Sequence, residues 1–133
     1  MKELTLEAKI ENLEQVQLFV ESVLEENGCP MKSLMQISIA VEEIFTNIAL
    51  YAYGEDTGEA RVCVRPLEAG AEITFLDRGM RYDPLQKEDP DVTLTAEERP
   101  VGGLGVFMVK KIMDEVRYEY RDGQNVLIMR KNW

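Results

Sequence analysis

The stretch from residue 31 to residue 53 constrains the fold most, because it predicts one long helix that is apolar over most of its surface. Its main stripe, at helical spacing, consists of Leu34, Ile37, Val41, Ile44, Phe45 and Ile48, and it is widened by Met35, Ile39 and Ala49. Other elements must cover such a helix, so we expect it to be central and buried. The same stretch nevertheless contains Glu42, Glu43 and Asn47, three polar residues where little of the helix faces water.

The remaining segments predict the elements that cover this helix. Patterns of period two predict strands at 3–10, 59–65, 71–77, 116–120 and 125–131, and helical periodicity predicts helices at 11–26 and 104–115. Asp122-Gly123 between the last two strands is typical of a hairpin turn. This order indicates an α+β fold in which helices pack on one face of a mainly antiparallel sheet. The polar segment from Arg78 to Pro100 is long for a connector and predicts a mobile loop or lid.

Composition narrows the classes of function. The 133 residues predict a single domain, residues 1–133. Lys and Arg total 15 against 25 Asp and Glu, a net charge of −10, which argues against nucleic-acid and acidic-membrane partners. No histidine is present, so acid–base chemistry must come from carboxylates, hydroxyls or a bound cofactor. Short apolar runs, a charged N-terminus and two cysteines without metal-like spacing predict a cytoplasmic protein.

Asp77 ends the strand predicted at 71–77 and shares a side with Ala71, Ile73 and Phe75, because side chains alternate across a strand. A carboxylate there would lie at the edge of the apolar interior, where it needs hydrogen-bond donors. Asp77 could simply start a turn as a local cap. It could instead accept a hydrogen bond from a ligand, such as the exocyclic amine of adenine, with Gly79 allowing close approach to the backbone.

The stretch 102-GGLGVF-107 opens the helix predicted at 104–115. Glycines at a helix start leave backbone amides exposed, and the helix dipole favours an anion there. The stretch therefore indicates either a phosphate-binding turn or only a tight turn into the helix.

Glu43 and Asn47 lie one turn apart on the same side of the central helix, whereas Glu42 points about 100° away. They could be an ordinary surface pair. Alternatively, the amide oxygen of Asn47 could bind Mg²⁺, which prefers oxygen ligands, and a nearby carboxylate could take a proton from an attacking hydroxyl.

These three elements, in this order, resemble the N, G1 and G2 boxes of the GHKL ATPase superfamily. The matching residues are Glu43-x-x-x-Asn47, Asp77-x-Gly79-x-x-Tyr82-Asp83-Pro84 and Gly103-Leu104-Gly105. Within that superfamily the short length, 42-EEIFTN-47 and 99-RPVGGLGVFMVKKIMDEV-116 look most like the RsbW-like anti-sigma-factor serine/threonine kinases. The resemblance extends from about Leu4 to Lys131.

The resemblance implies a Bergerat-type fold, a two-layer α/β sandwich with a mixed, mostly antiparallel sheet, three helices on one face and an ATP lid at about 83–103. It implies ATP and Mg²⁺ as cofactors. By the same resemblance Glu43 is the general base, Asn47 the Mg²⁺ ligand, Asp77 the adenine-binding residue and Gly79 the G1 glycine. Tyr82 and the stretch Gly103, Leu104 and Gly105 would also contact the nucleotide, the latter at its phosphates.

The chain departs from the pattern at three places. Tyr82 replaces the phenylalanine of the second box. The serine-kinase branch often has a histidine near Tyr51, and histidine kinases often have a cation near Leu50, but both are missing here. We therefore expect Arg99, in the lid, to supply the cation for the γ-phosphate.

The resemblance predicts a protein serine/threonine kinase that phosphorylates an anti-sigma antagonist (STAS-type) protein and binds a sigma factor, with a homodimer as a further expectation. A second hypothesis is a nucleotide-dependent binding module that switches partners with little or no phosphotransfer. A detached histidine-kinase ATPase domain, able to act only on another chain, and an α+β domain that binds no nucleotide are the remaining alternatives.

Overall fold

A five-stranded sheet forms one layer of the computed structural model, which describes residues 1–86 and 103–133. The strands are β1 (Lys2–Glu7), β2 (Glu59–Leu67), β3 (Gly70–Asp77), β4 (Glu115–Arg121) and β5 (Gln124–Asn132). Their spatial order is β1-β2-β3-β5-β4, and every pairing among these described strands is antiparallel. The α+β class with a mostly antiparallel sheet is confirmed.

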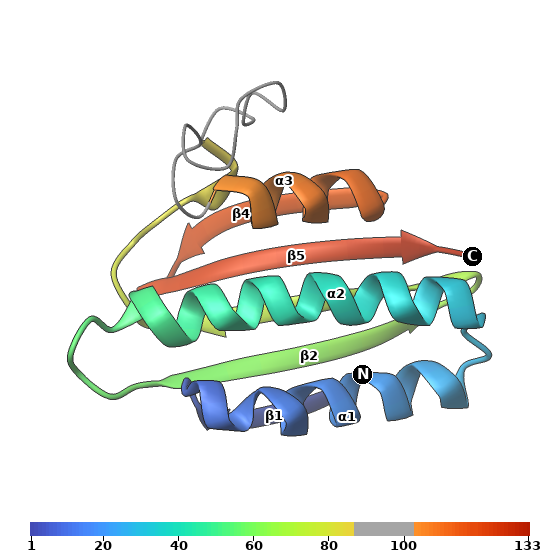
Figure 1. Cartoon of the computed structure of the whole chain (residues 1–133), viewed down its shortest axis with the longest axis horizontal. Helices are drawn as coiled ribbons and strands as arrows, with labels where there is room; N and C mark the ends of the chain where they lie inside the picture. Colours follow the sequence, from blue (N-terminus) through green and yellow to red (C-terminus); the bar gives the residue numbers. More distant parts are fainter. Residues whose placement is uncertain (87–102) are drawn as a thin grey trace.

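Three α-helices in the described residues form the second layer: α1 (Leu13–Glu26), α2 (Met31–Asn47) and α3 (Gly103–Ile112). Figure 1 shows them side by side on one face of the sheet, with α2 in the middle. Short 3₁₀ helices, η1 (Ile10–Asn12) and η3 (Pro84–Gln86), lie before α1 and after β3. The expected arrangement of a sheet covered by helices on one side is therefore confirmed.

The core lies between α2 and the central strands. Phe45 and Ile37 on α2 and Ile73 and Phe75 on β3 are at most 1% exposed, as is Met129 on β5. Burying a side chain of this size contributes roughly 1.5–3 kcal/mol. Alternate residues of the strands supply this face, so the period-two pattern of the sequence decides which side the helices cover.

The opposite face of the sheet is covered by no helix in the described residues. A small apolar cluster of Cys63, Leu76 and Val126 lies there. Beside it are ion pairs such as Arg65–Glu72 at 3.1 Å. A polar outer face is usual for an antiparallel sheet.

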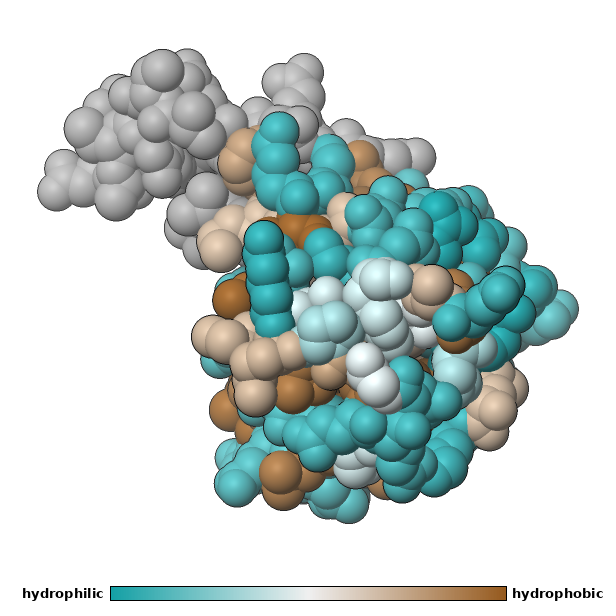
Figure 2. Space-filling view, turned by 90° about the vertical axis from the view of Figure 1, so that its right-hand side faces the viewer, coloured by the Kyte–Doolittle hydropathy of each residue, from teal (hydrophilic) through white to brown (hydrophobic). Residues whose placement is uncertain are grey.

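One end of the molecule, where α2 begins, faces the viewer in Figure 2, and hydrophilic residues cover much of it with hydrophobic residues between them.

The first strand is shorter than predicted. It ends at Glu7 instead of Ile10, because the side-chain amide of Asn12 donates to the Glu7 carbonyl at 2.9 Å and the chain turns into η1. Ile10 is consequently 43% exposed. The prediction placed Leu4, Leu6 and Ala8 correctly on the side that faces the core, but a local side-chain hydrogen bond ends the strand early.

The central helix also departs from the prediction. Its α-helical part ends at Asn47, and residues Ile48–Ala52, labelled η2, form a π-helix instead of a regular continuation to residue 53. By length and hydropathy the stretch Met31–Ala52 resembles a membrane span, but it packs on the sheet as the core helix. Single π-helical turns often lie at functional sites.

We predict that Phe45→Ala lowers the free energy of unfolding by about 3–5 kcal/mol, because it leaves a cavity between α2 and the sheet. Leu18→Ala on α1 is the matched control, since Leu18 is 59% exposed and its truncation is expected to change stability by less than about 0.5 kcal/mol. Urea unfolding followed by circular dichroism measures both variants. Equal losses for the two would contradict the assignment of α2 as the core helix.

Candidate functional site

A cavity of about 420 Å³ lies between the end of α2, the ends of the central strands and the loop after β3. Its walls are mainly apolar, with Ile48, Phe75 and Leu127 among them. The polar side chains that line it are Asn47, Tyr51, Asp77, Tyr82, Tyr118 and Asn125. An apolar cavity with a few convergent polar groups is typical of a small-molecule site.

Asp77 is the last residue of β3 and is 7% exposed. Its Oδ1 accepts hydrogen bonds from the Gly79 amide and from Asn125 Nδ2, both at 2.9 Å. In the described parts of the chain no donor reaches Oδ2, while Asp77 lines the cavity. Oδ1 therefore closes a local turn, as one of the two interpretations predicts, and a ligand donor to Oδ2 stays a prediction.

Burial raises the pKa of the Asp77 carboxyl above its ordinary value of 3.8, because desolvation disfavours the charged form. The hydrogen bonds from Asn125 and Gly79 act in the opposite direction and lower the pKa. The buried carboxylate thus depends on these two donors to remain an acceptor.

Asn125 is a site residue that the sequence analysis missed. It is 7% exposed at the start of β5, where its Nδ2 donates to Asp77 Oδ1 and to the Met80 carbonyl, both at 2.9 Å. Its Oδ1 accepts from the Tyr82 amide at 3.1 Å and from the Tyr118 hydroxyl. Alternation along β5 gives the signal that could have found it, because Asn125 shares the core face with Leu127 and Met129.

The loop after β3 is docked on the π-helical end of α2. The Met80 amide donates to the Ala52 carbonyl at 2.8 Å, and a Cβ on Gly79 would overlap that carbonyl oxygen. Only glycine lets the two backbones come this close. We expected Gly79 to let a ligand approach the backbone; in the structure the end of the protein's own helix lies there, and a ligand contact stays a prediction.

Glu43, Asn47 and Gly105 are brought together at the other end of the site. Asn47 is half-buried and lines the cavity, and its carboxamide makes no hydrogen bond within residues 1–86 and 103–133. Glu43 is also half-buried but lies outside the cavity wall, against α3, where a Cβ on Gly105 would overlap its Oε2. Glu42 is exposed on another side of the helix, as its spacing predicts.

The sequence predicts a Mg²⁺ ion at this end of the site, and such an ion would have few protein ligands here. Within the described residues no three His, Cys, Asp or Glu side chains gather as metal ligands. Mg²⁺ retains waters and needs few protein ligands when phosphate oxygens bind it. The Asn47 amide oxygen would be such a ligand, because it lies at the cavity wall and has no partner among the described residues.

Several predicted residues lie at or beyond the limit of the described chain. Arg99 and most of the lid predicted at 83–103 lie outside the described residues. Gly103 and Leu104 begin α3, and Tyr82 lines the cavity although it is 49% exposed. None of the described residues that line the cavity is a Lys or Arg; Tyr51 stands at the wall instead. The roles of all these residues stay predictions.

A family model described as the histidine kinase-like ATPase domain matches residues 6–131. The chain belongs to this family. The assignment to the GHKL type of ATPase domain, made from three short boxes, is confirmed across nearly the whole chain.

Relatives of known name support the RsbW-like branch. It is 29% identical over 130 residues to proteins named "Serine-protein kinase RsbW" from Bacillus cereus (strain AH187) and Bacillus thuringiensis (strain Al Hakam), covering 95% of this chain and 81% of each relative. A crystal structure of the RsbU and RsbW domains of a Mycobacterium tuberculosis protein superposes with a TM-score of 0.64 at 15% identity, over 99% of this chain and 32% of that chain. This structure supports the Bergerat-type fold, and this chain spans about a third of it.

We predict that Asp77→Asn raises the free energy of unfolding at neutral pH, because Asn keeps an oxygen that accepts both hydrogen bonds but removes a desolvated charge. The folded-state pKa of Asp77 lies above 3.8, so the wild type gains stability as the pH falls through that pKa. The advantage of the variant should therefore be largest near pH 7 and shrink towards pH 4.

Urea unfolding at several pH values measures this difference. Asp122→Asn, in the exposed hairpin turn, is the control for loss of one negative charge. A stability difference for Asp77→Asn that grew as the pH fell would contradict the role of desolvation.

Proposed function

We propose that this chain is a protein serine/threonine kinase that uses Mg-ATP. The observation that supports this most is the geometry of one cavity, with an unshared acceptor oxygen of buried Asp77 at one end and Asn47 at the other. The relatives named serine-protein kinase support the same class of activity.

Adenine suits the Asp77 end of the cavity. Its exocyclic amine is a donor that the Oδ2 of Asp77 can accept, and the flat ring suits apolar walls such as Ile48 and Phe75. Because Oδ1 is already occupied by two donors, the carboxylate cannot turn away from the cavity without breaking both hydrogen bonds.

The triphosphate would extend towards Asn47 and the start of α3. Mg²⁺, when bound with ATP, supplies charge neutralisation of the phosphates. Asn47 would hold it through the amide oxygen, and the backbone amides at the start of α3 would face the phosphate oxygens. Arg99 is proposed as the cation that approaches the γ-phosphate.

Glu43 is proposed as the general base. The acceptor hydroxyl oxygen forms a bond to the γ-phosphorus, the bond from that phosphorus to the β,γ-bridging oxygen breaks, and ADP leaves with the electron pair. Glu43 takes the hydroxyl proton. Among the described residues its carboxylate has no hydrogen-bond or ion-pair partner, so it can accept that proton without losing another interaction.

The resemblance to the RsbW-like anti-sigma-factor kinases is the basis for the proposed partners. We propose that the phosphoryl acceptor is an anti-sigma antagonist of the STAS type, that the chain also binds a sigma factor, and that it can act as a homodimer. A cytoplasmic location belongs to the same proposal.

A nucleotide-dependent binding module with little phosphotransfer is the second candidate. It is favoured by one observation, the absence of Lys and Arg among the described residues that line the cavity. Such a module would bind ATP tightly and change its partner with the nucleotide state.

We predict that Glu43→Gln lowers phosphotransfer to the cognate acceptor roughly 100- to 10,000-fold while ATP affinity changes by no more than about threefold, because the variant removes the base and keeps the shape. Glu42→Gln is the matched control, since Glu42 is exposed on another side of the same helix, and it should keep full activity.

Labelled ATP with candidate antagonist proteins measures transfer, and calorimetry measures binding. Full transfer by Glu43→Gln would contradict its assignment as the base. Tight binding of ATP by the wild type without transfer to any cognate antagonist would instead favour the binding module.

A further inference from the structure

We propose that Asn125 is the positioning residue that aims the free oxygen of Asp77 into the cavity and thereby sets the selectivity of the site for a base with an amino donor. The inference rests on the proposed nucleotide binding. It adds a residue that none of the three boxes contains and a reason why this cavity would prefer adenine to a 6-oxopurine.

The orientation of the Asn125 amide is fixed by its neighbours. The Tyr82 backbone amide can only donate, so the Asn125 atom that it contacts at 3.1 Å must be the oxygen. The other end of the carboxamide is then the NH₂ group, which lies 2.9 Å from both Asp77 Oδ1 and the Met80 carbonyl. A flipped amide would place oxygen against two acceptors, so one orientation satisfies every neighbour.

This fixed amide also fixes the Asp77 carboxylate. Oδ1 is held by the Asn125 amide on one side and by the Gly79 amide on the other, and Oδ2 is left without a described donor at the cavity. A 6-amino group donates to such an oxygen, whereas a 6-oxo group would set acceptor against acceptor in a buried site. Unpaired buried acceptors of this kind are the strongest basis for rejecting a near-isosteric ligand.

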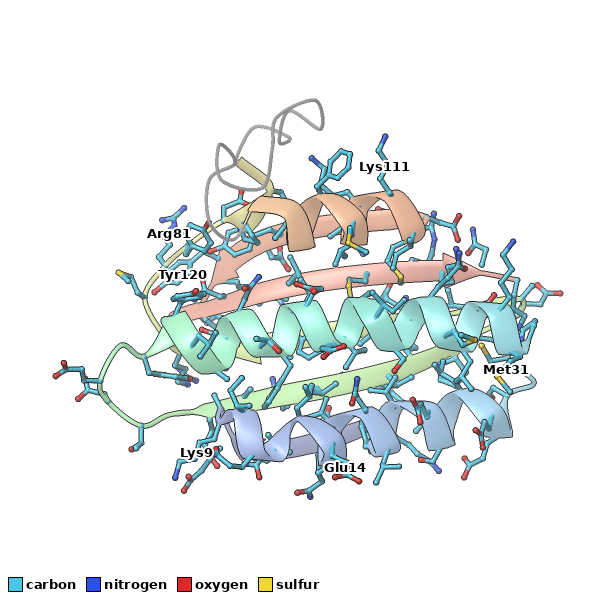
Figure 3. All side chains as sticks on the ribbon, viewed as in Figure 1. Lys9, Glu14, Met31, Arg81, Lys111 and Tyr120 are labelled. Carbon is cyan, nitrogen blue, oxygen red and sulfur yellow. The ribbon has the colours of Figure 1, made fainter. Side chains whose placement is uncertain are left out.

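Asn125 also fastens the loop that forms the rim of the cavity. Its amide bonds the Met80 carbonyl and the Tyr82 amide, two residues apart on that loop. Next to them the guanidinium of Arg81 lies 4.9 Å from the ring centre of Tyr120 on β4, and Figure 3 shows the two side chains adjacent. The β4–β5 hairpin therefore positions both the Asp77 carboxylate and the loop at the rim of the cavity.

The Tyr118 hydroxyl is a second contact of the Asn125 amide, and the orientation of that amide does not depend on it. This hydroxyl donates to Asn125 Oδ1, but the Tyr82 amide donates to the same oxygen. Loss of the Tyr118 hydroxyl therefore leaves the orientation of the amide determined, whereas loss of the Asn125 NH₂ group removes a donor from Asp77 itself.

The charge of Asp77 gives a readout that a purely structural role would not move. The titratable groups that face it are the Tyr53 hydroxyl from the end of α2 and the Tyr118 hydroxyl from β4, and the pKa of each is raised by burial. Arg78 and Glu59 lie beside Tyr53, at the ends of β3 and β2. None of these replaces the donor from Asn125, so its removal raises the pKa of Asp77 further.

The test is the affinity for ATP and for GTP between pH 5 and pH 8, measured by calorimetry on the full chain. We expect Asn125→Leu to lower ATP affinity roughly 10- to 100-fold at pH 7 and to reduce the ratio of ATP to GTP affinity. ATP affinity should fall as the pH is lowered and Asp77 becomes protonated, and in Asn125→Leu this fall should begin at a higher pH. Asn125→Thr, which keeps one donor in a strand-compatible side chain, should reverse part of each of these three changes. Asn132→Leu, the same substitution at an exposed position at the other end of β5 and away from the cavity, should bind ATP within about threefold of the wild type.

Each failure has a distinct meaning. If the wild type binds no ATP, the proposed function is wrong and this inference falls with it. If the wild type binds ATP but Asn125→Leu, folded by circular dichroism, shows an unchanged pH profile and an unchanged ATP-to-GTP ratio, the positioning role alone is overturned. If Asn125→Leu does not fold, the pH profile and base ratio of Asn125→Thr decide in its place, and values equal to those of the wild type overturn the proposal.

Discussion

Burial of α2 against the middle of an antiparallel sheet is the constraint on which the other elements depend. Phe45, Ile37 and Val41 are fully buried in that contact, and α1 and α3 flank the helix on either side. The sheet, α1 and α3 cover its inner side, whereas Met35 and Ile39 on the outer side are 61% and 40% exposed. The cavity lies where this cover stops, at the C-terminal end of α2. The position of the site is therefore set by the place where the packed core ends.

The polar chemistry of the site follows from the same boundary. Asp77 lies on the core face of β3 but at its last position, which places a carboxylate at the edge of the interior. A charge there is tolerable only with donors, and these come from its own turn and from Asn125 on the neighbouring strand. The cost of burying the carboxylate is thus offset on one oxygen, and the other oxygen remains a place where a bound base would complete the hydrogen bonding.

The sequence was sufficient for the fold class and for Asp77, because both depend on local periodicity. Alternation along residues 71–77 correctly placed Asp77 on the core face, and Asp122-Gly123 correctly marked the β4–β5 hairpin, where both residues adopt positive φ. Asn125 was missed because its role comes from strand pairing, which sets it directly opposite Asp77 although 48 residues separate them. The early end of β1 and the π-helix were missed for a similar reason. Each depends on specific contacts, and the periodic pattern of apolar residues does not reveal such contacts.

The π-helical turn at Ile48–Ala52 gives α2 two different halves. Each residue of a π-helix turns less about the axis than a residue of an α-helix, so the α-helical spacing of the stripe changes after Asn47, although Ile48 still packs in the core. Leu50 and Tyr51 are 51% and 57% exposed in this segment, and the carbonyl of Ala52 accepts a hydrogen bond from the loop after β3. One continuous helix therefore has two parts. The residues before Asn47 pack mainly in the core, and the residues from Asn47 to Ala52 also contribute to the wall of the cavity.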